Sequence, residues 1–215
     1  DLARAHFLYN QLYAGQAVFS HAPGQAKAKL RIGYLSPDFN EHVDMFFVIQ
    51  LLACYDRSRY EVYCYSLTEH EDNTTEQVRE LADGWRSLGA LPPREAAQRI
   101  YEDGVDILFD LAAHASGGKT LRVMGYRPAP VQLSGIGYMS TTGMRAVDYF
   151  LTDRYCDPEG QNDELFSERL VRLAHTHLCY TPSERVLQCH RTYALHDPVV
   201  FGSFNNFSKI TDRML

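Results

Sequence analysis

Apolar and polar positions form short blocks along the chain, and these blocks predict strands and helices in alternation. The segment Leu30–Tyr34 alternates between the two classes as a strand does, whereas the apolar run Met45–Ala53 does not alternate and is typical of a buried helix. Strands that alternate with helices at this spacing predict a parallel α/β sheet. The other predicted strands are Tyr60–Leu67, Val105–Leu111, Val131–Leu133, Val147–Leu151 and Leu170–Leu173, and the other predicted helices lie at residues 1–16, 73–82 and 93–104.

A parallel sheet also predicts where ligands bind. Such sheets bind them beyond the carboxyl ends of their strands, so the loops at 36–43, 68–73 and 112–118 are the candidate site-forming segments. The helix that follows the second of these loops has a recognisable start. Asn73 is followed by Glu76 at the spacing of a capping box.

The composition excludes several function classes. The 215 residues carry 27 acidic and 21 basic side chains, a net charge of −6, which argues against binding to nucleic acid or an anionic membrane. No apolar run approaches the roughly 18 residues that a membrane-spanning helix needs. Five scattered cysteines without a C-x-x-C pair favour a reducing, cytoplasmic compartment over a disulfide framework. Because the chain begins without Met, we expect it to be part of a longer protein.

One candidate pattern for metal binding lies near the carboxyl terminus. A zinc site could recruit His175, His177, Cys179, Cys189 and His190, but these residues do not have the usual ligand spacings. The simpler interpretation is that His175 and His177 lie on one face of an extended segment and bind no metal. We therefore expect no metal.

A second pattern resembles a phosphate-binding loop incompletely. The segment 113–120 follows an apolar strand and contains Gly118, Lys119 and Thr120, but Ala113 stands where a P-loop has its first glycine. Alanine adopts the required backbone conformation poorly. A tight strand-to-helix turn is therefore favoured over a nucleotide triphosphatase site.

Three single residues are candidates for catalysis. His42 lies in the first loop, near the positive end of a helix, where a neutral imidazole is favoured; the alternative is a surface histidine. Lys209 follows Asn205 and Asn206 at a predicted strand-to-helix junction, which suits a phosphate, although a solvated lysine is the alternative. Asp103 stands before Gly104, and an Asp-Gly pair that ends a helix explains its presence without a catalytic role. The chain has no D-x-D pair, the feature that many metal-dependent sugar-nucleotide enzymes display.

Several segments, taken in order, resemble the catalytic region of O-linked N-acetylglucosamine transferases of the bacterial, tetratricopeptide-linked branch. The resemblance runs from about Leu30 to the end, and RPAPVQ at 127–132 and FNNFSKI at 204–210 are its most specific parts. It implies a Rossmann-like parallel sheet, the first half of a GT-B glycosyltransferase, with an N-terminal helix before it and the start of the second half after it. The implied division is a helical tail and linker at 1–28, a catalytic half at 29–175, a connector at 176–197 and the start of the second half at 198–215.

The resemblance also implies roles for individual residues. His42 falls on the active-site histidine, a base or acceptor-positioning group, and Lys209 on the lysine that neutralises the departing nucleotide diphosphate. Asp103 falls near an aspartate considered as a base. The implied substrate-binding residues are Ile136, Gly137, Tyr138 and Asn206.

This sequence departs from the better-known animal pattern at some positions of the site. Met139 follows the tyrosine where that pattern has Pro-Gly, Asn206 replaces a glutamine and Val43 replaces a common proline. These differences do not change the expected fold, but they leave open which sugar the enzyme transfers.

The implied function is glycosyl transfer. The chain would be part of a metal-independent enzyme that moves N-acetylglucosamine or a related sugar from a UDP-sugar to Ser or Thr hydroxyls of proteins, with no cofactor beyond the donor. As an incomplete catalytic region it is expected to be inactive alone. A non-catalytic module of the same fold that binds a peptide or partner is the alternative. Neither nucleic acid nor membrane is an expected partner, and the oligomeric state is open.

Overall fold

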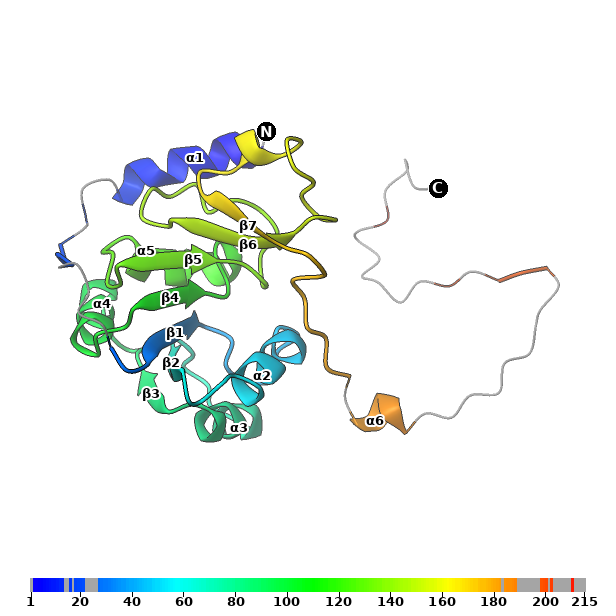
Figure 1. The fold of residues 1–215 in the computed structure, drawn as a ribbon, viewed down its shortest axis with the longest axis horizontal. Coiled ribbons are helices and arrows are strands. Elements are labelled where there is room, and N and C mark those ends of the chain that lie inside the picture. Colours follow the sequence, from blue (N-terminus) through cyan, green and yellow to red (C-terminus); the bar gives the residue numbers. More distant parts are fainter. Residues whose placement is uncertain are drawn as a thin grey trace. The chain divides into compact units, whose positions relative to one another are not determined.

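A seven-stranded sheet forms the centre of the structure, a computed structural model (Figure 1). The spatial order is β3-β2-β1-β4-β5-β6-β7, and all six pairings are parallel. The prediction of a parallel α/β sheet is therefore confirmed. The strands are β1 (Leu30–Ser36), β2 (Tyr60–Ser66), β3 (Gly84–Ser87), β4 (Ile107–Asp110), β5 (Val131–Ser134), β6 (Tyr149–Asp153) and β7 (Arg169–Leu173).

Helices cover both faces of this sheet. On one face, apolar side chains of α2 and α3 join a core cluster that includes Val48, Leu52 and Val78. On the other, α4 and α5 contribute Ile100 and Leu121 to a second cluster. The helices of this part of the chain are α1 (Leu2–Tyr13), α2 (Met45–Ala53), α3 (Asn73–Leu81), α4 (Pro93–Glu102) and α5 (Lys119–Met124), with short 3-10 turns η1 (Ala115–Gly118) and η2 (Asp163–Leu165).

The structure describes residues 2–13, 16, 18–21, 27–182, 184–188, 198–200, 202 and 210. The chain divides into two units, Asp1–Thr181 and Pro182–Leu215. In the second unit a short helix, α6 (Glu184–Leu187), is described. Most of the segment 198–215, which was expected to begin the second half, lies outside the described residues, and so do Asn206 and Lys209.

Two local predictions need correction. The capping box of α3 begins one residue earlier than predicted, because the Asp72 carboxylate accepts from the Thr75 N–H at 3.0 Å and the Thr75 hydroxyl accepts from the Asp72 N–H at 3.0 Å. The edge strand β3 was not predicted. Its four residues include one large apolar side chain, Trp85, so the segment shows no alternation long enough to indicate a strand.

Helix α1 packs tightly against the sheet domain at a glycine. Gly143 has a φ of +72°, and a Cβ built there would lie 2.0 Å from the backbone oxygen of His6. Beside it, the Arg145 N–H donates to the Asn10 side-chain oxygen at 3.0 Å. The absence of a side chain at Gly143 therefore lets the helix backbone approach the loop that follows β5.

We predict that Gly143→Ala lowers the free energy of unfolding more than Gly160→Ala does. Both glycines have left-handed φ values, +72° and +73°, so each alanine incurs about 1–2 kcal/mol of backbone strain. At Gly160 no heavy atom lies within 4 Å of the added Cβ. At Gly143 the clash with α1 adds roughly 1–3 kcal/mol. Urea denaturation of both variants tests this, and equal losses would contradict the tight docking of α1.

Candidate functional site

Polar loops gather at the carboxyl edge of the sheet. The loops that follow β1, β4 and β5 begin at neighbouring strands, since these three strands lie side by side in the sheet. They carry His42, the turn at 112–118 and the loop at 135–143 respectively. The arrangement agrees with the general position of ligand sites in open parallel sheets.

His42 lies just before α2, on the solvent side of this edge. Its side chain is 40% exposed, and that of the nearby Asp44 is 13% exposed. The His42 Nδ1 lies 3.5 Å from the Asp44 Oδ2 and 3.3 Å from the Asp44 backbone N–H. Burial raises the pKa of Asp44, and the neighbouring His42 opposes that shift. The predicted catalytic histidine therefore has an open face and an acidic neighbour.

The loop at 135–137 approaches the His42 loop closely. A Cβ at Gly137 would lie 2.1 Å from the Leu111 backbone oxygen and 2.6 Å from the Asp44 Oδ2. Ile136 beside it is buried and has a φ of +73°. Gly137, predicted to line the sugar pocket, is thus brought within contact distance of the residue that neighbours His42.

A buried carboxylate organises the turn after β4. Asp110 is fully buried and accepts hydrogen bonds from the backbone N–H groups of Ala112 and Ala113, both at 3.0 Å, and from the Ser134 hydroxyl at 2.7 Å. Burial raises the pKa of Asp110, and these hydrogen bonds oppose that shift. Ala113 adopts a φ of +45° here. The amide of Ala113, the first residue of the P-loop-like segment, is already bound to Asp110, so the structure favours the tight-turn interpretation.

Tyr138, the third residue predicted to bind substrate, contacts helix α1. Its hydroxyl lies 3.1 Å from the His6 Nε2, and the His6 ring stacks on the His114 ring with centroids 4.1 Å apart. His114 is fixed in turn by a 2.8 Å contact between its Nε2 and the Thr142 backbone oxygen. The sequence offered no signal for this cluster, because its members come from segments far apart in the chain.

Asp103 is not brought to this site. It ends α4 and precedes β4, and so it lies at the amino edge of the sheet, opposite His42. Its carboxylate pairs with Arg86 at 2.6 Å and accepts from the Tyr65 hydroxyl at 3.1 Å. These contacts support the structural interpretation of Asp103.

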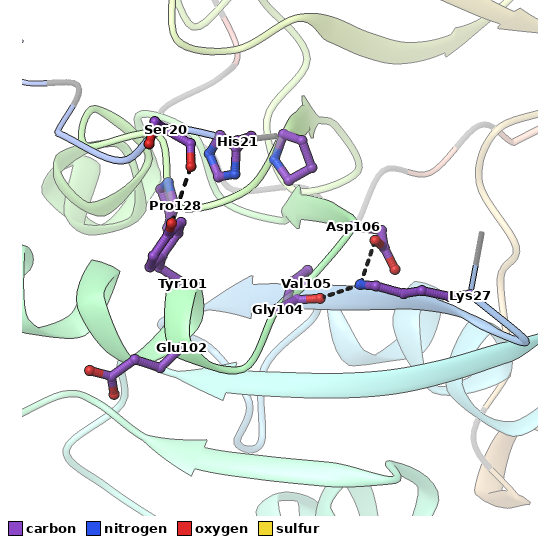
Figure 2. Close-up of a pocket in the computed structure, with 10 residues that line it drawn as sticks. Ser20, His21, Lys27, Tyr101, Glu102, Gly104, Val105, Asp106 and Pro128 are labelled. Carbon is purple, nitrogen blue, oxygen red and sulfur yellow. Dashed lines mark hydrogen bonds and ion pairs between the residues drawn. The ribbon is translucent and has the colours of Figure 1, made fainter. Parts of the chain in front are cut away.

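A cavity of about 440 Å³ also lies at the amino edge (Figure 2). The segment before β1 lines it, and the Lys27 ammonium donates to the Asp106 carboxylate at 2.6 Å and to the Gly104 backbone oxygen at 2.8 Å. The Tyr101 hydroxyl donates to the Ser20 backbone oxygen at 3.1 Å. These contacts fix the segment before β1 to the end of α4, and none of the predicted site residues that the structure describes lines this cavity.

Asp153, at the carboxyl end of β6, forms a further polar cluster at the carboxyl edge of the sheet. Its carboxylate accepts from the backbone N–H of Cys156 at 2.9 Å and from that of His177 at 3.0 Å, and its Oδ2 lies 2.6 Å from the His177 Nδ1. One possible ligand atom from each of these three residues lies within 4.8 Å of the others. The hydrogen bonds account for the cluster as a connection between β6 and the segment after β7.

The geometry defines a Rossmann-like domain with its polar site at the carboxyl edge, and the comparisons identify its family. Residues 8–181 match the family described as glycosyl transferase family 41. The chain belongs to this family. This membership confirms the resemblance inferred from the motifs.

Named relatives and a solved structure agree with this assignment. The probable UDP-N-acetylglucosamine–peptide N-acetylglucosaminyltransferase SPINDLY of Petunia hybrida is 40% identical over 192 residues, which are 87% of this chain and 20% of that protein. The UDP-N-acetylglucosamine–peptide N-acetylglucosaminyltransferase of Caenorhabditis elegans is 33% identical over 160 residues, 74% of this chain and 14% of that protein. An O-GlcNAc transferase of Thermobaculum terrenum aligns with a TM-score of 0.78 at 36% identity, over 85% of this chain and 35% of that one.

These comparisons confirm the predicted fold, a Rossmann-like half of a GT-B glycosyltransferase. The chain spans about one fifth of the length of the curated plant relatives that it matches. Within the described part of the chain, no helix is both long enough and apolar enough to cross a membrane.

We predict that Asp153 makes the stability of the chain sensitive to acid. The Cys156 backbone N–H and the His177 side chain hold the pKa of Asp153 well below its ordinary value. The ionised carboxylate therefore contributes stability that is complete above the unfolded pKa of about 4 and is lost as the pH falls through the lower folded value. Asp153→Asn should reduce stability at pH 7 and weaken its decline from pH 5 to pH 2.

Thermal unfolding between pH 2 and pH 7 measures both effects. Glu159→Gln is the matched control, since Glu159 is an exposed acid on the same loop. An unchanged pH dependence in Asp153→Asn would show that other carboxylates cause the acid sensitivity.

Proposed function

We propose that this chain provides the amino-terminal catalytic half of a protein O-glycosyltransferase. The donor is UDP-N-acetylglucosamine or a closely related UDP-sugar, and the acceptor is a Ser or Thr hydroxyl of a protein. The observation that carries this proposal is the position of His42 at the carboxyl edge of a family 41 sheet, next to the loop that contains Gly137. The names of the relatives support the sugar and the peptide acceptor.

In the proposed reaction, one residue acts as the general base and another stabilises the leaving group. The acceptor oxygen attacks the anomeric carbon, its proton passes to His42 as general base, and the bond to the diphosphate breaks. UDP leaves with developing negative charge, which a fixed cation stabilises. We assign that cation to Lys209, on the basis of the FNNFSKI motif.

The last residues of the first unit pack on the helix that follows His42. The Thr181 N–H donates to the Phe46 backbone oxygen at 2.6 Å, and the Tyr180 ring packs 5.6 Å from that of Phe47. These contacts hold the first turn of α2, and with it the His42 loop, against the segment after β7.

We predict that His42→Ala lowers kcat of the complete enzyme by roughly 10²-fold or more, the usual effect of a positioned general base. The variant should remain folded, because the side chain is 40% exposed. Lys209→Ala should cost more, since a cation aimed at the leaving group acts mainly in the transition state. Steady-state transfer to a peptide acceptor measures both. A His42→Ala enzyme within twofold of wild type would exclude the histidine from catalysis.

We also predict that the complete enzyme retains its activity in EDTA. The sequence has no D-x-D pair, and Lys209 would take the role that a divalent cation has in many sugar-nucleotide enzymes. The measurement compares transfer rates after dialysis against EDTA and after addition of Mn²⁺. Loss of activity in the chelator with recovery in Mn²⁺ would contradict the metal-free mechanism.

A further inference from the structure

Asp44 occupies a capping position without acting as a cap. It is the N-cap residue of α2, where an aspartate ordinarily accepts a hydrogen bond from a backbone N–H of the first turn. Its side chain makes no such bond, and its φ and ψ of −63° and −26° are helical instead of extended. The carboxylate faces His42 instead, with Oδ2 3.5 Å from Nδ1. Side-chain capping therefore does not explain an acid at this position.

The surroundings confine this carboxylate. The Asp44 side chain is 13% exposed, and Gly137 packs so closely that a Cβ there would lie 2.6 Å from its Oδ2. A carboxylate largely removed from water needs a partner for its charge. His42 is the partner within reach, and its own side chain stays open to solvent on the other side.

We propose that Asp44 is a positioning residue that acts through His42. Its carboxylate keeps the proton on Nδ1, so that Nε2 presents a lone pair to the acceptor hydroxyl. When the acceptor oxygen bonds to the anomeric carbon, the hydroxyl proton moves to Nε2 and the diphosphate leaves with the electron pair of the broken bond. Asp44 then stabilises the imidazolium, as a carboxylate does in other histidine–acid pairs. This inference rests on the proposed function of His42.

One backbone N–H and two further carboxylates also lie near His42. The Asp44 backbone N–H donates to Nδ1 at 3.3 Å and would favour the opposite tautomer, but the full negative charge of the carboxylate at 3.5 Å outweighs this neutral donor. Asp38 has a carboxylate oxygen within 4.8 Å of these atoms, and its oxygens also lie 3.4 and 3.5 Å from the Ser116 hydroxyl. From α3, Asp72 contributes a carboxylate that accepts from the Glu41 N–H at 2.6 Å.

The tautomer of His42 tests the pairing without any activity. Long-range ¹H–¹⁵N NMR spectra of the 215-residue chain distinguish protonation at Nδ1 from protonation at Nε2, and the signal missing in His42→Gln identifies the residue. At a pH where the ring is neutral, we expect the Nδ1–H form in wild type and a shift toward the Nε2–H form in Asp44→Asn. Glu41→Gln, which removes an exposed neighbouring charge, should match wild type.

An Nε2–H form in wild type, or identical spectra for wild type and Asp44→Asn, would overturn the proposal. A change in Asp38→Asn but not in Asp44→Asn would transfer the role to Asp38 and overturn it as well. Circular dichroism of each variant verifies that it is folded before its spectra are compared.

Kinetics of the complete enzyme test the catalytic use of the pair. We expect Asp44→Asn to lower kcat about tenfold or more with little change in KM for the UDP-sugar, and Asp44→Glu to recover part of the loss. The acid limb of the kcat profile should move to lower pH, because the imidazolium loses its counter-charge.

An altered tautomer with unchanged kcat would overturn the positioning role. A wild-type enzyme without transfer would instead refute the proposed function, and the NMR result would still decide the pairing.

Discussion

The carboxyl edge of this domain is organised around the buried carboxylate of Asp110. A fully buried acid is costly unless its oxygens are hydrogen-bonded, and here two backbone amides and the Ser134 hydroxyl satisfy them. These bonds fix the turn after β4 and connect it to the end of β5. The Gly137 loop starts from that strand end and packs on Leu111, so its position depends on the same network.

This arrangement places three chain segments from different parts of the sequence around His42. The β1–α2 loop supplies the imidazole and Asp44, the β4 turn supplies the Leu111 carbonyl, and the β5 loop supplies Gly137. The distances between them leave no room for a side chain at Gly137. Close backbone contacts of this kind fix the relative positions of the three segments, and a fixed geometry is what positioned acid–base catalysis requires.

Much of the fold could be predicted from the sequence, because the strands of the sheet interior are apolar and the α2 run is apolar throughout. Residues 45–53 were predicted as a helix with the boundaries that the structure shows. The β3 edge strand was missed, since GWRS carries no periodic pattern. The family resemblance nominated loop residues such as His42 and Gly137 for the site. It did not nominate Asp44, because nothing in the sequence distinguishes an aspartate that caps a helix from one that pairs with a histidine.

The docking of α1 has a consequence for dissecting the protein. His6 stacks on His114 and contacts the Tyr138 hydroxyl, and the helix backbone lies against Gly143. A fragment that began at β1 would expose the faces of both aromatic rings and remove the support of the loop at 138–143. A piece that is meant to retain a native carboxyl edge therefore includes α1, which begins at Leu2, twenty-eight residues before the first strand of the sheet. Expression, crystallisation and binding studies of this half need that helix as part of the folding unit.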